Sequence, residues 1–132
     1  MFVALILFSL YISFVDARHH RISNRVLLIT FLSLLALSVI TETGVHPLTG
    51  LSVLLFTPLI LRVGIGAGDI KLLTVLTLFF IPLTWDMASD FLLSFTLISA
   101  TLLIIRLAKS QSFTGSIALA PAICGAVIWC AR

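Results

Sequence analysis

The amino-acid sequence predicts an all-α, polytopic membrane protein with about six transmembrane helices. Of the 132 residues, 61% are hydrophobic and only 10% carry a charged side chain, whereas a soluble domain has about 25% charged residues. The mean hydropathy is +1.27, and the charged residues cluster between long apolar runs. No polar stretch is long enough to fold separately, so we expect residues 1–132 to form a single transmembrane domain.

Six apolar runs are the expected membrane spans. They lie at residues 1–15, 26–41, 47–62, 70–87, 89–107 and 114–131. Several are shorter than the roughly 20 residues of a spanning helix, but flanking Ser, Thr, Trp and Tyr residues extend them to the interface. The first run lacks a basic segment before it, and Asp16 stands where a cleavage site would fall. We therefore expect a retained span and not a signal peptide.

The basic residues predict the orientation of these spans. When the first loop, "DARHHRISNR", is placed in the cytoplasm, the connections alternate so that seven of the eight basic residues lie inside. These seven are Arg18, Arg21, Arg25, Arg62, Lys71, Arg106 and Lys109, and only Arg132 lies outside. An excess of Lys and Arg in cytoplasmic loops is typical of membrane proteins. Six spans with both termini outside are therefore predicted.

Neither the cysteines nor the histidines suggest a metal site or another cofactor. Cys124 and Cys130 are six residues apart in the last apolar run, whereas a structural zinc site needs four ligands at characteristic spacings. We expect both to be small packing residues. His19 and His20 are expected to be interfacial polar residues. The net charge of +3 is explained by the topology, and no nucleic-acid partner is expected.

The five acidic residues fall into two groups. Glu42, Asp86 and Asp90 lie in the expected outside connections, where solvation explains them. Asp16 and Asp69 are the only acids on the expected cytoplasmic side, and each stands at the boundary of a span. An ionisable residue at or in the bilayer is costly and usually marks a functional site. Asp16 and Asp69 are therefore the candidate functional pair.

Two carboxyl groups held close together favour one particular chemistry. They do not both ionise readily, so the pair shares a proton near neutral pH. The ionised carboxylate then takes a proton from water while the protonated one donates to a scissile carbonyl, which is aspartyl peptide-bond hydrolysis. The simpler alternatives are that Asp69 caps the fourth helix and that Asp16 is solvated in a charged loop.

Three glycines at alternate positions, Gly64, Gly66 and Gly68, lead into Asp69. Each destabilises a helix by about 1 kcal/mol relative to alanine. We expect them to permit an irregular backbone that carries the Asp69 carboxylate toward Asp16. A dinucleotide-binding G-x-G-x-x-G motif is excluded, because one that started at Gly64 would need glycine at position 69.

Three segments resemble those of type IV prepilin peptidases, membrane aspartyl proteases that also include the archaeal preflagellin peptidases. "GAGDIKLL" resembles their G-x-G-D-x-K-L signature. "DARHHRISN" resembles the D-x5-I-P-N context of their first aspartate, with Ser23 in place of proline. "SIALAPAICGAV" is similar to the family's proline-containing last segment, with Ala118 in place of the first proline and Pro121 and Gly125 retained.

The resemblance implies that Asp16 and Asp69 are the catalytic pair of a membrane aspartic endopeptidase. It implies supporting positions within the same motifs: Gly66, Gly68, Lys71 and Asn24. By the resemblance, the enzyme sits in the inner (cytoplasmic) membrane and faces the cytoplasm. There it removes basic leader peptides from prepilin-like proteins, next to a glycine and just ahead of an apolar helix. That helix is expected to pack in the lipid bilayer while the cleavage site reaches the pair.

Lys71 and Asn24 each have two possible roles. Residues i and i+2 on a helix do not face each other, so no ion pair between Lys71 and Asp69 is expected. A snorkelling interfacial anchor is favoured for Lys71 over contact with substrate or lipid headgroup. Asn24 either caps the second helix or, by the resemblance, shapes the loop that holds Asp16.

Larger bacterial members of this family carry an N-terminal domain with paired CxxC motifs and methylate the new N-terminus. The chain has no CxxC motif, so a peptidase-only form without a methyltransferase domain is predicted. Nothing in the sequence indicates an oligomeric state.

Two rival interpretations remain open. In the first, a small non-enzymatic membrane protein, such as an ion or proton pathway subunit, uses Asp16 and Asp69 as relay groups. A relay needs acids or histidines distributed across the bilayer, whereas every other acid lies on the expected outside, which argues against it. In the second, the protein resembles presenilin or signal peptide peptidase, which cut within the membrane. Those carry a Y-D context, whereas Val15 precedes Asp16 here.

Overall fold

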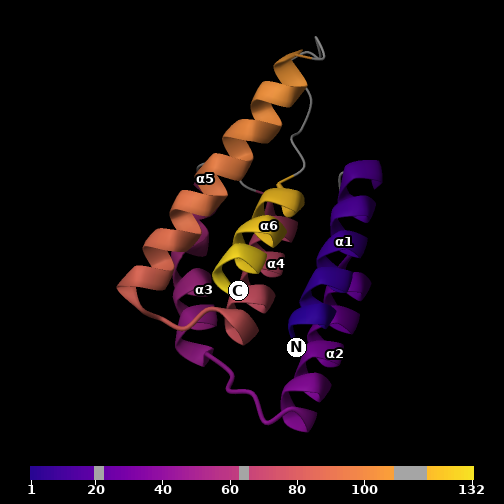
Figure 1. The fold of residues 1–132 in the computed structure, drawn as a ribbon, viewed down its shortest axis with the longest axis vertical. Coiled ribbons are helices and arrows are strands. Elements are labelled where there is room, and N and C mark those ends of the chain that lie inside the picture. The colour runs from indigo at the N-terminus through magenta and orange to yellow at the C-terminus, as the bar shows by residue number, and fades with distance from the viewer. Residues whose placement is uncertain (20–22, 63–65, 109–118) are drawn as a thin grey trace.

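The structure, a computed structural model, describes residues 1–19, 23–62, 66–108 and 119–132, with the backbone alone for Ala17, His19 and Arg106. These ranges form six α-helices and no strand. The helices are α1 (Phe2–His19), α2 (Asn24–Ile40), α3 (Pro47–Arg62), α4 (Ala67–Phe80), α5 (Trp85–Ala108) and α6 (Ala120–Cys130). Successive helices run in opposite directions (Figure 1). The prediction of an all-α fold is confirmed.

The break between α4 and α5 lies earlier than the sequence predicted. The sequence placed the connection at "TWDMASD", residues 84–90, but α4 ends at Phe80 and α5 begins at Trp85. Pro82 follows the end of α4, and the residue before a proline is disfavoured in the helical region. Thr84 then caps α5, because its Oγ1 accepts a hydrogen bond from the backbone N–H of Met87 at 3.3 Å. Hydropathy alone hides this break, since the connecting residues are themselves apolar.

As a consequence, Asp86 and Asp90 belong to α5 and not to a connection, which corrects the expectation for both. Asp86 lies in the first turn of α5, where the helix dipole favours a negative charge. Both side chains are exposed, so solvation still explains them.

Two further boundaries differ from the expected spans. The first helix continues to His19, so Asp16 lies within the last turns of α1 and not at its end. The last helix begins at Ala120, and the predicted start at residue 114 lies outside the described residues. By contrast, α3 has the bounds that the third apolar run predicted.

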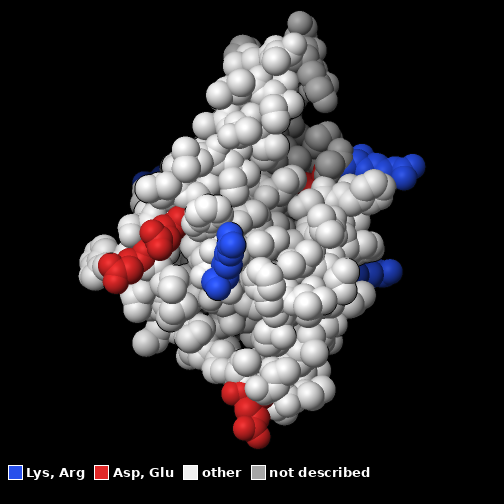
Figure 2. All heavy atoms as spheres, in the orientation of Figure 1, with Lys and Arg blue, Asp and Glu red and all other residues white. Residues whose placement is uncertain are grey.

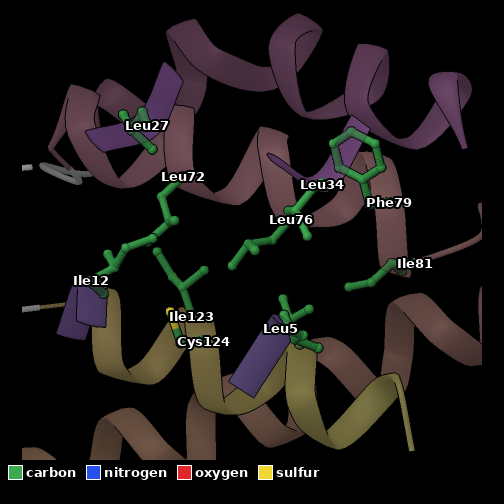
Figure 3. Packing of buried hydrophobic residues seen from close by; sticks show 12 residues of the cluster. Leu5, Ile12, Leu27, Leu34, Leu72, Leu76, Phe79, Ile81, Ile123 and Cys124 are labelled. Carbon is green, nitrogen blue, oxygen red and sulfur yellow. The ribbon is translucent and has the colours of Figure 1, made fainter. Parts of the chain in front are cut away.

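The core lies between α1, α2, α4 and α6. Figure 3 shows Leu5 and Ile12 of α1 pointing toward Leu72 and Leu76 of α4, with Ile123 between them. Cys124 belongs to the same cluster, which confirms its expected packing role. Helices α4 and α6 pack on each other and on two further helices each, whereas α3 packs on α4 alone and α5 on α6 alone. Helices α4 and α6 therefore form the centre of the bundle.

The outer surface of the helices is apolar. Leu55 of α3 is 75% exposed and Trp85 of α5 is 92% exposed, while Ser9 and Thr30 are buried. Figure 2 shows few charged side chains, separated by broad uncharged surface. Soluble proteins rarely expose apolar patches of this extent. By length and composition one stretch, Trp85–Ile105, is long enough to cross a membrane, and four more helices carry shorter apolar stretches.

Two glycines allow neighbouring helices to approach closely. A Cβ atom on Gly50 of α3 would lie 3.2 Å from Leu78 Cδ1 of α4. One on Gly125 of α6 would lie 2.9 Å from Ile98 Cδ1 of α5. Small residues at helix crossings are typical of helix packing in membranes. They let α3 pack closely on α4, and α5 pack closely on α6.

Candidate active site

Asp16 lies near the end of α1 with its side chain only 5% exposed. The backbone N–H of Ala120, the first residue of α6, donates a hydrogen bond to Asp16 Oδ2 at 3.4 Å. The first N–H groups of a helix have no partner within that helix, and they carry a partial positive charge. The N-terminus of α6 therefore directs a backbone donor at the Asp16 carboxyl group.

Asp69 is held at the N-terminus of α4. Gly66 is the N-cap of this helix, which places Asp69 at the third helical position. A hydrogen bond from the backbone of Gly66 reaches the Asp69 carboxylate, as in one half of a capping box. The alternative that Asp69 is itself the N-cap is therefore wrong.

Gly66 is needed here for space and not for an unusual backbone conformation. Its φ and ψ are −65° and 144°, an extended conformation that any residue adopts. A Cβ atom at this position, however, would lie 3.2 Å from Asp69 Oδ2. The expectation of an irregular backbone at Gly66 is thus wrong, because the missing side chain leaves room for the folded-back carboxylate. Gly68 lies in the first turn of α4, and Gly64 lies outside the described residues.

Both carboxyl groups lie near the N-terminus of α6. Leu119, the N-cap of α6, lines the same cavity as Asp69, and the next residue, Ala120, donates to Asp16. Adjacent residues of one helix end therefore border both acids. The approach is close enough for the negative charge of Asp16 to act on Asp69.

The environment of Asp69 changes its acidity. Asp69 lies one residue before the apolar run that begins at residue 70, and so at the expected boundary of that span. Burial, and secondarily the charge of Asp16, raises the pKa of Asp69 from 3.8 to about 6, while the hydrogen bond from Gly66 opposes the rise. A carboxyl group in these surroundings keeps its proton closer to neutral pH than a free aspartate does, which suits a general acid.

Lys71 and Asn24 contact each other at this end of the bundle. Lys71 Nζ donates to Asn24 Oδ1 at 3.0 Å, and the pair is exposed. Lys71 therefore joins α4 to α2. The capping role considered for Asn24 is wrong: Ser23 is the N-cap of α2, and its Oγ accepts from the N–H of Arg25 at 3.3 Å.

Basic side chains gather at the same end. Arg18, Arg25 and Arg62 are exposed and lie at the ends of α1, α2 and α3 nearest the two aspartates. Several residues used in the sequence argument lie outside the described ranges: His20, Arg21, Ile22, Lys109 and Ala118. The same holds for the side chains of His19 and Arg106.

Sequence reasoning missed two parts of this site. One is the N-terminus of α6, which donates to Asp16. Pro121 in the first turn of α6 was the available indication, because proline is enriched there. The other is an apolar cavity of about 170 Å³ beside Asp69, bordered by Leu73, Phe91 and Leu119. No local pattern predicts that cavity, because residues from four helices, α3, α4, α5 and α6, line it.

The fold and the site define a helical membrane protein with a paired-carboxyl centre at one end of the bundle. The comparison with family models is more specific: the model of the type IV leader peptidase family matches residues 3–108, which include Asp16 and Asp69. The match covers most of the chain, and the chain therefore belongs to the type IV leader peptidase family. Neither the search of curated proteins nor the search of solved structures found a match.

Family membership confirms the resemblance stated from the sequence motifs. The protein is a peptidase of the type IV leader kind and a membrane protease, and its family implies prepilin-like substrates. The matched residues contain two of the three motifs. The third, around Pro121 and Gly125, lies beyond them, although its helix supplies the hydrogen bond to Asp16.

Proposed function

We propose that the protein is an aspartic endopeptidase in which Asp16 and Asp69 are the catalytic pair. The observation that carries the proposal is that both carboxyl groups border the N-terminus of α6 in different environments. Asp16 accepts from Ala120 N–H, whereas Asp69 is half-buried beside an apolar cavity. Such a difference separates the roles of two identical groups.

We assign the roles as follows. The ionised Asp16 takes a proton from a water molecule, and the water oxygen attacks the carbonyl carbon of the scissile peptide bond. The protonated Asp69 donates its proton to the carbonyl oxygen, which gives a neutral tetrahedral diol. The C–N bond then breaks as Asp16 passes its proton to the amine nitrogen and one diol hydroxyl returns a proton to Asp69. Both aspartates end in their starting states.

The placement in the membrane is part of the proposal. We place the end that carries Asp16 and Asp69 at the cytoplasmic face of the inner membrane, because Arg18, Arg25 and Arg62 surround it and basic residues favour the cytoplasmic side. The six helices then cross the bilayer in alternate directions as a single peptidase domain over residues 1–132.

The substrates proposed are pilin-like or pseudopilin-like precursors. Such a protein presents a basic leader in the cytoplasm and an apolar helix in the bilayer. Cleavage between the two, next to a glycine, matches a carboxyl pair at the boundary between apolar helices and a basic end. The basic residues near the pair do not attract the leader by charge, so we assign them to topology and anionic lipid.

The test is cleavage of a prepilin-like substrate in detergent or membranes by the parent and by Asp16→Asn and Asp69→Asn variants. Each variant is expected to lose at least about 10³-fold in kcat, since each removes an essential proton transfer. Asn keeps the shape and an acceptor oxygen, and folding is checked by circular dichroism and gel filtration. Asp90→Asn, on α5 at the opposite end, is the matched control and keeps parental activity. If either dyad variant cuts at the parental rate, the proposed pair is wrong.

A further inference from the structure

A groove lies between α3 and α5, with α4 as its floor. Both helices flank the central pair, yet no Cα atom of α3 comes within 8 Å of one in α5. Two cavities fill the space between them, one of about 170 Å³ beside Asp69 and one of about 310 Å³ further along α4. Leu73, Phe91 and Leu92 line both cavities. We call the two together the α3–α5 groove.

The length of the groove suits a helix. It begins at Asp69, in the first turn of α4, and reaches Ile81 just past the end of that helix. Twelve residues of helix rise about 18 Å, or about three turns. The walls are mainly apolar, so the groove fits apolar side chains on one face of a helix at positions i, i+3, i+4 and i+7.

The end of the groove distinguishes a peptide from a lipid chain. Asp69 lines the smaller cavity, so an occupant of the groove reaches one carboxyl group of the proposed pair. A peptide helix in the groove presents a backbone amide bond to that carboxyl group, whereas an acyl chain has no amide bond for the pair to hydrolyse. This continuity with the candidate active site favours a peptide occupant.

We propose that the α3–α5 groove binds the apolar helix of the substrate that follows the scissile bond. The inference rests on the proposed function and assigns its substrate-docking surface. Because Asp69 lines one end of the groove, a helix docked there brings the peptide bond at its own N-terminal end to the carboxyl pair. Helix packing against α3, α4 and α5 thus sets which bond is cut.

A second groove provides the comparison. It lies between α2, α3 and α4, has a volume of about 300 Å³ and includes Leu28, Phe31 and Leu54. Its polar end is formed by Asn24 and Lys71 and not by a carboxyl group of the pair. A helix bound in it would end beside the Asn24–Lys71 contact, so it serves as the matched control surface.

Cross-linking tests the proposal directly. In a background with Cys124→Ala and Cys130→Ala, Leu92→Cys is compared with Leu28→Cys, whose parent side chains are 61% and 57% exposed. A prepilin-like substrate with one cysteine in the second turn of its apolar helix is the probe. Disulfide formation with the Leu92 variant alone is expected. Cross-linking with the Leu28 variant alone would overturn the proposal. An enzyme–enzyme disulfide at position 92 would also overturn the proposal, because a second copy of the chain would then fill the groove. The absence of any cross-link would overturn it as well, because the groove would then hold lipid.

Kinetics provide the second measurement. Leu92→Trp is expected to raise KM about tenfold, because the larger side chain obstructs binding of the substrate helix. It is expected to change kcat by no more than about twofold, because Asp16 and Asp69 stay intact. Leu28→Trp is expected to match the parent. Equal KM values for all three enzymes would overturn the proposed binding of the substrate helix in the groove, and would leave the peptidase assignment in place. If the parent itself cuts nothing, the proposed function fails first, which distinguishes the two failures.

Discussion

At the scale of single residues, Asp16 and Asp69 have the same side chain in two different surroundings. Asp16 is buried and accepts a hydrogen bond from the first amide of α6. Asp69 is half-buried beside an apolar cavity and near the charge of Asp16, which favours its protonated form. The difference comes from what surrounds each carboxyl group, and the proposed roles of base and acid rest on it.

This assignment predicts the pH dependence of the peptidase. The raised pKa of Asp69, about 6, means that its protonated fraction falls as pH rises through 6. We therefore expect kcat/KM to fall above pH 6, by up to about tenfold per pH unit, since kcat/KM follows the free enzyme's titration. Initial rates between pH 4.5 and 8.5 measure the profile. Asp86→Asn, at the opposite end of the bundle, should leave it unchanged. Constant kcat/KM up to pH 8 would contradict Asp69 as the acid.

At the scale of helices, the N-termini of α4 and α6 build the site. Helix α4 holds Asp69 back against its own N-cap, Gly66, and α6 turns its free amide toward Asp16. Both arrangements use the same property, namely that the first turn of a helix has donors without partners. The two helices pack on each other in the core, and this packing holds their two N-termini in place relative to each other.

The N-cap of α4 supplies the element-scale prediction. Gly66→Ala places a methyl group 3.2 Å from Asp69 Oδ2, so the carboxylate must move by a few tenths of an ångström. We expect kcat to fall by about tenfold, because small misplacements of a catalytic group are costly, while the thermal midpoint changes little. Gly44→Ala is the control, since a Cβ there meets nothing within 4 Å. Full activity of the Gly66 variant would show that the carboxylate works in another position.

The α4–α5 connection shows what hydropathy leaves undetermined at this scale. Pro82 and Thr84 end one helix and cap the next, and both residues are visible in the sequence. Their neighbours Ile81 and Leu83 are apolar, however, so a window on hydropathy continues through the break. Turn chemistry, and not apolar content, decides where these helices end.

At the scale of the whole molecule, the two ends of the bundle differ in charge. Arg18, Arg25 and Arg62 lie at the end with the carboxyl pair, whereas Glu42 and Asp86 lie at the other end. The described helices alternate in direction (Figure 1), as six crossings require. This polarity supports the proposed orientation, because positive charge is retained in the cytoplasm.

Cysteine labelling tests that orientation. In the background with Cys124→Ala and Cys130→Ala, a membrane-impermeant thiol reagent is added to intact spheroplasts. Thr43→Cys, at an exposed site between α2 and α3, is expected to be labelled at once. Arg25→Cys, exposed at the opposite end of α2, is expected to react at least about tenfold less until the membrane is opened. The reverse pattern would place the carboxyl pair outside the cell, and labelling of both sites would contradict an alternating topology.

The sequence by itself determined the fold class, the positions of most helices and the candidate pair. Long apolar runs need helices to satisfy their backbone in lipid, and the few charges could be sorted by loop. The bounds of α3 followed directly from its apolar run. The motifs around Asp16 and Asp69 also indicated the family that the match over residues 3–108 shows.

Only the tertiary structure decided how the two aspartates differ and what lies beside them. The amide of Ala120, the space at Gly66 and the apolar cavity at Asp69 depend on distances between helices that are far apart in sequence. Periodicity and hydropathy describe each helix relative to its solvent and carry no information on those distances. Electrostatic coupling and cavities arise when helices pack, so they became visible only in the assembled bundle.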